Sequence, residues 1–390
     1  MARLLLLSLL FACDDDTATV DRPPKPDRSE EADTDTDTDT DTDTDTDTDT
    51  DSDTDTDTDT DTDVDTDTEP DCPDGIVCVV DFPFEHASTT TGAEWDRFDS
   101  YGCSSSTDES GPEVLYRVTL PEAGFLGLEL DEGDMPSGVD VDVHLLGSRD
   151  ADDCLDRGHW RAGSLLDAGT YWVTADTWVD SSGSEQDGRY TLRFGFTTAD
   201  GLADEGMDYS VAEDALHAYD VAWHRGEADH FGYAVTDFGM HAGDKRQWVV
   251  DMATGEVLWN LFVAHGEGSA SASDDAIADA FSNINNSHQS SLGMVRAAEI
   301  YTGRFGYSMR LDGLESGYNS NVRSRAIVVH PWEGSRTEYV NHYGAAANTW
   351  GCPALDDRIS ADVIDFLADG GLLLFHYNDG DWSRSSAYLP

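Results

Sequence analysis

The chain has 390 residues, a length that suggests two or three domains. Its 22 lysines and arginines stand against 81 acidic residues, which gives a net charge of −59 at pH 7. This balance argues against nucleic-acid binding, because a phosphate backbone needs a positive surface, and against electrostatic docking on an anionic membrane. Only one long apolar run is present, at the N-terminus, so the sequence predicts no bundle of membrane spans.

The N-terminus has the pattern of an export signal. Arg3 precedes an apolar stretch over residues 4–12 that is too short to span a membrane. Cys13 follows, and its setting resembles the acylated cysteine of bacterial lipoproteins. We expect residues 1–12 to be a lipoprotein signal peptide and Cys13 to carry acyl chains that anchor the protein, with an ordinary export signal as the alternative. The expected location is the bacterial cell envelope, facing the periplasm, with the choice of inner or outer membrane left open.

Residues 13–71 are predicted to be a disordered tether that begins at the lipidated cysteine. Residues 33–68 are an Asp-Thr repeat broken only by Ser52 and Val64. Such a segment has almost no apolar surface to offset its conformational entropy, and its charges repel one another. The aspartates do not form a calcium loop of the EF-hand type, because the glycine and glutamate which that loop requires are missing, so weak counter-ion binding is the better interpretation.

The cysteine count fits an exported protein. Once Cys13 is set aside for the lipid, an even set of four lies before residue 155, and one cysteine, Cys352, remains. The simplest scheme, and one of three possible, pairs Cys72 with Cys78 and Cys103 with Cys154. A lone cysteine in an oxidising compartment is either incidental or chemically used.

The first folded region, residues 72–198, is predicted to be a β-sandwich. Five segments have the β-branched and aromatic composition of strands and are separated by Gly, Asp and Ser turns: 114–120, 124–130, 139–146, 169–175 and 189–194. Residues 100–196 also resemble the bacterial pre-peptidase C-terminal domain, through 111–116, 140–142, Cys154 and 166–171. The resemblance implies a non-catalytic accessory domain. Asp140 and Asp142 share a strand face that suggests calcium, although a solvated face is the preferred interpretation.

The second region, residues 199–390, is predicted to be β-rich with a few helices. A helical, linking segment is expected over 199–229, followed by strands at 231–235, 247–251, 257–263, 325–330 and 372–377, with a helix over 360–369. The expected fold class is therefore mostly β, with an accessory sandwich followed by a β-rich catalytic domain.

The second region also contains the reactive candidates, Cys352 and His330. A cysteine nucleophile reacts as its thiolate, which a nearby imidazole produces by accepting the proton. His330 ends an apolar run, so a strand would deliver it to the edge of a core. Cys352 follows Gly351, whose small size lets the backbone approach a substrate closely, and the N–H groups of both residues are candidates for contacting an oxyanion.

Residues 230–380 resemble the L,D-transpeptidase catalytic domain family, in the branch whose active cysteine precedes Pro-Ala. The family places a histidine about twenty residues before a Ser/Thr-x-Gly-Cys box, and here His330 precedes the cysteine of Thr349-Trp350-Gly351-Cys352 by 22 positions. Further matching segments lie at 263–269, 281–283, 290–293, 301–303, 306–311, 313–315, Asn319 and 325–330. The resemblance implies a catalytic set of Cys352, His330 and Thr349.

Two departures from the common family pattern concern substrate binding. Pro331 follows the histidine where glycine is usual, and the arginine that usually follows the cysteine is missing. The residue that holds the substrate carboxylate is therefore open. Arg325 and Arg310 are the substitutes to test, and we add Asn319 and Ser291, from matching segments, to the substrate-binding candidates.

The implied reaction is transfer of a peptidoglycan stem peptide onto Cys352 as a thioester and then onto an amine of a neighbouring stem. Water as acceptor would make the same site an L,D-carboxypeptidase. A non-catalytic binding module, or attachment of a protein to the wall, are the remaining alternatives. No cofactor or metal is expected, because paired cysteines and a His-Glu-x-x-His motif are missing near Cys352. His265 is read as structural or pocket-lining.

Overall fold

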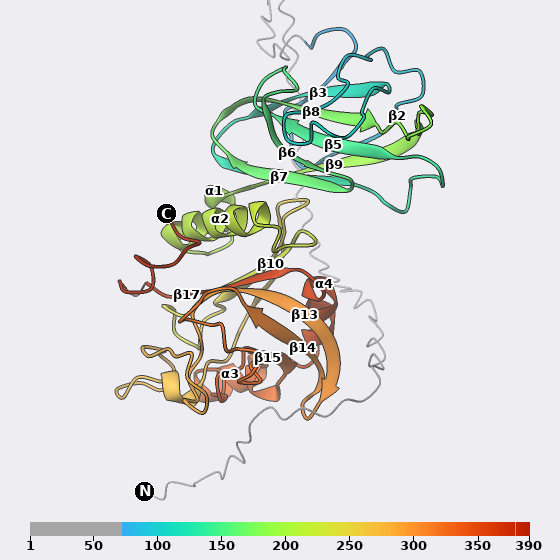
Figure 1. Ribbon diagram of the computed structural model, residues 1–390. Helices are drawn as coiled ribbons and strands as arrows, with labels where there is room; N and C mark the ends of the chain where they lie inside the picture. Colours follow the sequence, from blue (N-terminus) through green and yellow to red (C-terminus); the bar gives the residue numbers. More distant parts are fainter. Residues whose placement is uncertain (1–71, 379) are drawn as a thin grey trace, which may run out of the picture. The chain divides into compact units, whose positions relative to one another are not determined.

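The computed structural model describes residues 72–378 and 380–390 (Figure 1). The predicted signal peptide, the lipid acceptor Cys13 and the Asp-Thr tether lie outside the described residues. Within the described part, none of the helices combines the length and the apolar character needed to cross a membrane. The described chain is mostly β, which confirms the predicted fold class.

Two sheets make up the N-terminal region. One has the strand order β1-β3-β8-β5-β6 and the other has the order β2-β9-β4-β7. The bounds of the nine strands are β1 (Ile76–Val79), β2 (Phe84–Thr89), β3 (Glu113–Leu120), β4 (Gly124–Leu130), β5 (Val141–Leu146), β6 (Cys154–Gly158), β7 (Arg161–Leu166), β8 (Gly169–Thr177) and β9 (Arg189–Thr198).

The two sheets share one apolar core, as a β-sandwich requires. Leu126, Leu128 and Leu130 of β4 alternate inward from one sheet, and Val141 and Val143 of β5 do so from the other. All five side chains are at most 1% exposed. The alternation that predicted these strands therefore marks the residues that hold the sandwich together.

Disulfide bonds cross-link the chain in this region. Cys103 and Cys154 are joined, with their Cα atoms 5.5 Å apart. Cys72 and Cys78 are also disulfide-bonded. All four cysteines that were predicted to form bridges are therefore disulfide-bonded in this structure.

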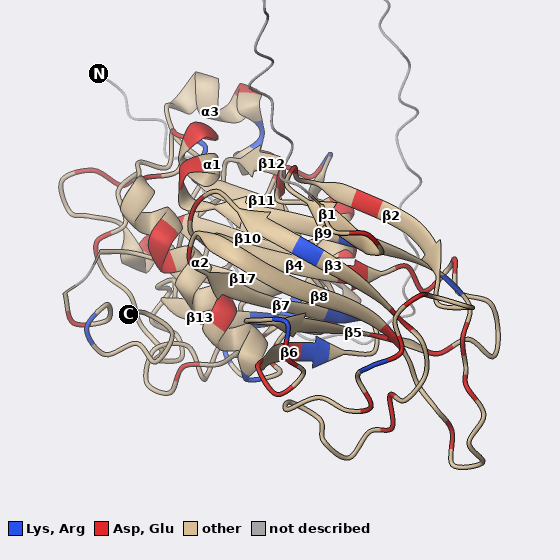
Figure 2. Ribbon diagram, turned by 90° about the horizontal axis from the view of Figure 1, so that it is seen from above, with Lys and Arg blue, Asp and Glu red and all other residues tan. Residues whose placement is uncertain are grey.

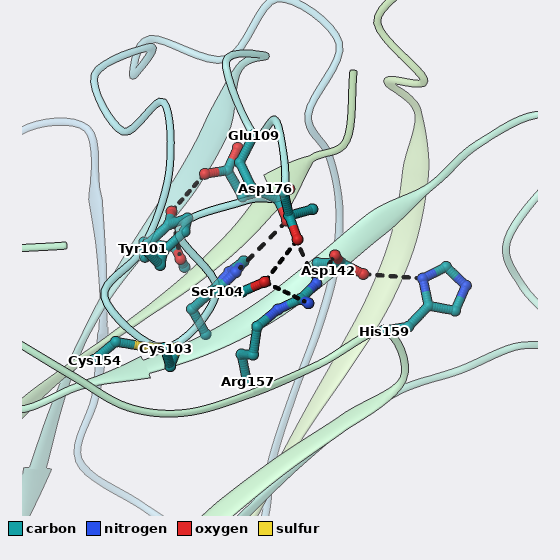
Figure 3. A network of polar contacts seen from close by, with 12 residues as sticks. Tyr101, Cys103, Ser104, Glu109, Asp142, Cys154, Arg157, His159 and Asp176 are labelled. Carbon is teal, nitrogen blue, oxygen red and sulfur yellow. Dashed lines mark hydrogen bonds and ion pairs between the residues drawn. A yellow bond between two sulfur atoms is a disulfide. The ribbon is translucent and has the colours of Figure 1, made fainter. Parts of the chain in front are cut away.

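A buried polar network lies beside the Cys103–Cys154 bridge (Figure 3). Arg157 pairs with Asp142 and lies 3.4 Å from Oε1 of Glu109, whose side chain is 1% exposed. Burial, and next the neighbouring Asp142, raise the pKa of Glu109 to about 9. The sandwich therefore encloses a carboxyl group that prefers to keep its proton.

Two helices follow β9 directly, α1 (Ala199–Asp204) and α2 (Tyr209–His224). The Asp208 carboxylate caps α2 by accepting the Ser210 N–H at 2.9 Å. The predicted helical segment over 199–229 is therefore confirmed. The proposed domain boundary at 198/199 coincides with the end of β9, but the division into separate domains stays a prediction, since residues 74–390 fall in one compact unit.

The C-terminal region is built on one eight-stranded sheet of order β12-β11-β10-β17-β13-β14-β15-β16 (Figure 1). Its strands are β10 (Gly232–Asp237), β11 (Gln247–Asp251), β12 (Glu256–Leu261), β13 (Gly293–Gly303), β14 (Gly306–Gly313), β15 (Val328–Pro331), β16 (Ala354–Leu355) and β17 (Leu372–His376). The other elements are η1 (Glu267–Ser269), η2 (Glu333–Ser335), α3 (Thr337–Tyr343) and α4 (Ser360–Leu367).

The last strand of the chain lies in the middle of this sheet. β17 pairs in parallel with β10 and antiparallel with β13. Its five residues are all buried, which accounts for the continuous apolar run Leu372-Leu373-Leu374-Phe375. The helix that was predicted over 360–369 is α4, and it turns Val363, Ile364 and Leu367 inward.

One strand begins later than the sequence suggested. A strand was expected from Arg325, but β15 starts at Val328. The reason is a turn: the Arg325 N–H donates to the Asn321 carbonyl at 2.8 Å, and Ala326 has a φ of 54°. The shift matters because it frees the segment before β15 to line a pocket.

The acidic excess is visible over the described residues. Figure 2 shows Asp and Glu spread over loops and strand ends, with few Lys and Arg between them. Any positively charged recess on this chain is therefore exceptional.

Candidate active site

Cys352 lies in the loop between α3 and β16, and it is the cysteine of the described residues that is not in a disulfide. Its side chain is 2% exposed. The Thr349 hydroxyl donates to the Cys352 carbonyl at 2.8 Å and accepts the Gly351 N–H at 3.2 Å. The hydroxyl predicted from the Thr-x-Gly-Cys box thus closes the turn that presents the cysteine.

Gly351 is required by this turn for two reasons. Its φ is +112°, a region that side-chain-bearing residues rarely occupy. A Cβ on Gly351 would also lie 2.6 Å from the carbonyl oxygen of Gln289. The Gly351 N–H was predicted to contact an oxyanion, but it already donates to Thr349, and this bond competes with that contact. The oxyanion contact of the Cys352 N–H stays a prediction.

The turn is docked on the segment that carries His265. The Thr349 N–H donates to the His265 carbonyl at 2.8 Å, and the Glu267 N–H donates to the Thr349 carbonyl at 2.7 Å. The His265 ring is fully buried and accepts from Arg246 at Nδ1, at 2.8 Å. Burial, followed by the Arg246 charge, lowers the pKa of His265 to about 4. His265 therefore acts as a neutral structural support of the cysteine turn.

A small pocket of about 30 Å³ opens at Cys352. The Cys352 thiol donates to the Ala326 carbonyl at 3.6 Å on its wall. Three lining residues have left-handed backbone, namely Asn286 (φ 60°), His288 (φ 56°) and Ala326 (φ 54°). Strained backbone of this kind concentrates at functional sites. The lining residues are Asn285, Asn286, His288, Arg325, Ala326, Ile327, Trp350 and Cys352.

Arg325 organises the wall of this pocket. Its guanidinium donates to Ser282 O and Ser291 Oγ through Nη1, at 2.5 and 2.7 Å, and to Ser287 Oγ and Gln289 O through Nη2, at 3.1 and 2.6 Å. Burial lowers the pKa of Arg325, and attraction to the Cys352 thiolate opposes that shift. Arg325 therefore ties down the loop over 282–291 and places a positive charge near the thiolate.

His330 lies on β15, opposite Ala354 of β16, the strand that follows the cysteine turn. The Pro331 carbonyl lies 3.0 Å from Nδ1, so Nδ1 carries the proton and Nε2 is left as the basic atom. Burial lowers the pKa of His330 to about 4. The carbonyl of Pro331 therefore orients the ring of His330.

The comparison with protein families decides what this site belongs to. Residues 203–377 match the family model of the L,D-transpeptidase catalytic domain. This part of the chain is an L,D-transpeptidase catalytic domain. The family predicted from the Thr-x-Gly-Cys box and its histidine is thereby confirmed. None of the curated proteins matches the chain.

Two solved structures are similar to about a third of this chain. The pre-peptidase C-terminal domain of collagenase from Bacillus anthracis shares 12% identity at a TM-score of 0.21, over 31% of this chain and 96% of that chain. Aeromonas hydrophila PliG, a periplasmic lysozyme inhibitor of g-type lysozyme, shares 9% at a TM-score of 0.20, over 31% and 97%. The first is the kind of domain predicted for residues 72–198.

Three predicted substrate-binding residues of the L,D-transpeptidase domain do not line the cysteine pocket. The Asn319 side chain is buried, donates to the carbonyls of Leu292 and Met294, and accepts the Glu315 N–H. Ser291 accepts from Arg325 and is 2% exposed. Arg310 lies over the Tyr301 ring, 4.2 Å from its centroid, and pairs with Glu299. The predicted contact of Asn319, Ser291 and Arg310 with substrate stays a prediction, and the positions of these three side chains away from the pocket lining do not support it.

Sequence reasoning missed, among other residues of the pocket, the ring pair His288 and Trp350. Their rings stack, with centroids 4.2 Å apart and planes 8° apart. His288 belongs to a loop without regular periodicity, and Trp350 occupies the variable position of the cysteine box. Only the fold brings them together, so no sequence signal marked the pair.

One group of side chains among the described residues could hold a metal ion, and it lies in the sandwich: Asp140, Asp142 and His159. Nδ1 of His159 is 3.0 Å from Asp140 and 2.9 Å from Asp142, and Arg157 also pairs with Asp142. The Arg157 guanidinium thus already supplies a positive charge to Asp142. We therefore assign no metal to this group.

Proposed function

We propose that the domain is a cysteine-dependent L,D-transpeptidase that acts on peptidoglycan stem peptides through a Cys352 thioester. The observation that carries the proposal is the buried, reduced thiol of Cys352 on a turn held by Thr349, beside a pocket that Arg325 lines with its charge. His330, neutral and with Nε2 as its basic atom, supports the assignment of the general base.

In the first half-reaction, the Cys352 proton passes to Nε2 of His330 and the sulfur attacks the carbonyl carbon at the L-centre of a diamino acid in a stem tetrapeptide. A carbon–sulfur bond forms and the bond to the terminal D-alanine breaks. The departing amine takes the proton from His330. In this mechanism Thr349 is a positioning residue and the Cys352 N–H faces the developing oxyanion.

In the second half-reaction, an amine of a neighbouring stem attacks the thioester carbonyl and gives its proton to His330. The carbon–sulfur bond breaks, the thiolate is regenerated, and a 3→3 cross-link remains. If water attacks instead, the product is a tripeptide and the activity is that of an L,D-carboxypeptidase. Both outcomes share the thioester, so the acceptor is the feature to measure.

Intact mass spectrometry after incubation with a tetrapeptide muropeptide tests the proposal, with Cys352→Ala as the matched control. An adduct on the unsubstituted protein that Cys352→Ala lacks, together with dimeric muropeptides, supports the transpeptidase. An adduct with tripeptide alone supports the carboxypeptidase. If neither adduct nor product forms, the proposal fails and a peptidoglycan-binding module replaces it.

We propose further that the protein is lipid-anchored through Cys13 in the bacterial cell envelope and faces the periplasm. The apolar residues 4–12 before Cys13 support this location. The mass of the N-terminal peptide is the test, because acylation adds a lipid mass that Cys13→Ser lacks. A mature N-terminus at any other residue would contradict the anchor.

A further inference from the structure

The pocket at Cys352 is lined, among the described residues, by basic side chains and by no acidic ones, which is unusual in so acidic a chain. No Asp or Glu is among the described residues that line it, whereas His288 and Arg325 both line it. The chain as a whole carries a net charge of −59. A recess without lining acids, next to the nucleophile, is therefore suited to an anionic group of the substrate.

Arg325 is poorly placed to be the direct ligand of that group. Both of its terminal nitrogens already donate to two acceptors each within the loop over 282–291. Releasing them would cost several charge-assisted hydrogen bonds and would loosen the wall that Arg325 holds. The positive charge of Arg325 therefore attracts an anionic group in the pocket without a direct hydrogen bond to it.

His288 is held in place from two sides. Its ring lies flat on Trp350, and Oε1 of Glu267 is 2.8 Å from Nδ1. The left-handed backbone conformation at His288 sets the direction in which the side chain leaves the main chain. With Nδ1 directed to Glu267, Nε2 is the ring nitrogen that a ligand can contact.

The size of the pocket limits what can enter it. About 30 Å³ leaves room for a small polar group. A carboxylate is such a group, and in the proposed reaction the leaving residue carries one, a single residue beyond the bond that Cys352 attacks. Consecutive residues are about 3.8 Å apart, so the carboxylate stays close to the nucleophile.

We propose that His288 is the specificity residue that binds the terminal carboxylate of the acyl donor, with Glu267 and Trp350 as its positioning residues. This inference rests on the proposed function. It assigns the carboxylate contact, left open by the missing arginine after Cys352, to a residue that stands 64 positions earlier in the chain.

The test compares two tetrapeptide donors that differ only at the C-terminus, one a free acid and one a carboxamide. The rate of thioester formation on Cys352 is followed by intact mass. The amine of the carboxamide donor is the better leaving group, so any preference for the acid reports recognition. We expect the unsubstituted protein to prefer the acid by at least about tenfold, the size of one charge-assisted hydrogen bond.

His288→Asn is the informative variant, because asparagine tolerates left-handed backbone and keeps the loop conformation. It should abolish the preference by raising KM for the acid donor about tenfold, with the limiting acylation rate and the carboxamide donor little changed. Glu267→Gln should give a smaller loss. His342→Asn, an exposed histidine on α3, is the matched control and should keep the full preference.

The outcomes separate the two proposals. Equal acylation by both donors, or a His288→Asn variant that keeps the preference, overturns the role of His288 and leaves the transpeptidase proposal intact. A purified, folded protein that neither donor acylates overturns the proposed function, and the role of His288 with it. A His288→Asn variant in which KM rises and the limiting acylation rate also falls would show that His288 only supports the turn. That result would also overturn the inference.

Discussion

The imidazole of His330 lies flat against the ring of Phe305, with centroids 4.3 Å apart and planes 16° apart. This stacking covers the ring, and His330 is 2% exposed. Burial disfavours the charged form, which is why the pKa of His330 is lowered to about 4.

We therefore predict an acid limb near pH 4 in the profile of kcat/KM for thioester formation, because the neutral ring is the base and protonation removes it. Phe305→Leu uncovers the ring and should move the limb upward toward the ordinary histidine value of about 6.5. Single-turnover acylation measured from pH 3.5 to 8 checks both. A limb near 6.5 in the unsubstituted protein would contradict the assignment.

The Thr349 hydroxyl should be required for activity through the turn it closes. Thr349→Val keeps the shape but loses the bonds to the Cys352 carbonyl and the Gly351 N–H, so acylation should fall about 10- to 100-fold, the equivalent of one or two lost hydrogen bonds. Thr349→Ser keeps the hydroxyl and should retain most activity. Equal losses in both variants would show that packing, and not the hydroxyl, matters. Acylation rates at saturating donor provide the measurement.

Gly351→Ala should damage both stability and activity. The positive φ costs an alanine about 1 kcal/mol, and the clash with the Gln289 carbonyl adds to it, so we expect a loss of about 1–3 kcal/mol in the free energy of unfolding. Urea unfolding measures the loss. Gly344→Ala, also at positive φ but with open space around the Cβ, is the control and should lose less. Equal losses would mean that the clash is relieved by a small shift.

Much of the fold follows from periodic segments. The strands β3, β4, β8, β11 and β17 were all predicted, because each has an apolar run or alternation that ends at a turn. Among the strands that were missed, β2 and β6 contain polar residues and are only half-buried, so they lack that signal. Strands β13 and β14 were noticed only as segments resembling a family.

The chemistry of the site was easier to predict than its recognition surface. Cys352, Thr349 and His330 share a short spacing pattern that the sequence displays. The pocket wall depends on Arg325 folding back onto the loop over 282–291, which is a tertiary event. His288 reaches the pocket only through that loop, so its position could not be derived from composition or period.

The buried acid Glu109 should make the stability of the sandwich depend on pH. Because its folded pKa is raised to about 9, the folded state holds a proton that the unfolded state releases above about 4.5. The associated stability is complete below about pH 4.5 and declines as the pH rises toward 9. Glu109→Gln should flatten this decline by about 1 kcal/mol per pH unit between pH 5 and 8.

Urea unfolding at a series of pH values measures that slope. The exposed Glu94→Gln removes the same charge without changing the buried network, and its slope should match that of the unsubstituted protein. A Glu109→Gln variant with an unchanged slope would show that Glu109 is ionised within the folded sandwich.

The central position of β17 has a consequence for the order of assembly during synthesis. Until Leu372–His376 leaves the ribosome, β10–β12 and β13–β16 have no strand to join them, and they remain two half-sheets. The turn with Cys352 is made before that point but has no completed sheet behind it. A nascent or prematurely terminated chain therefore cannot form the finished catalytic domain, and the reactive thiol gains its full setting only when synthesis of the domain is nearly complete.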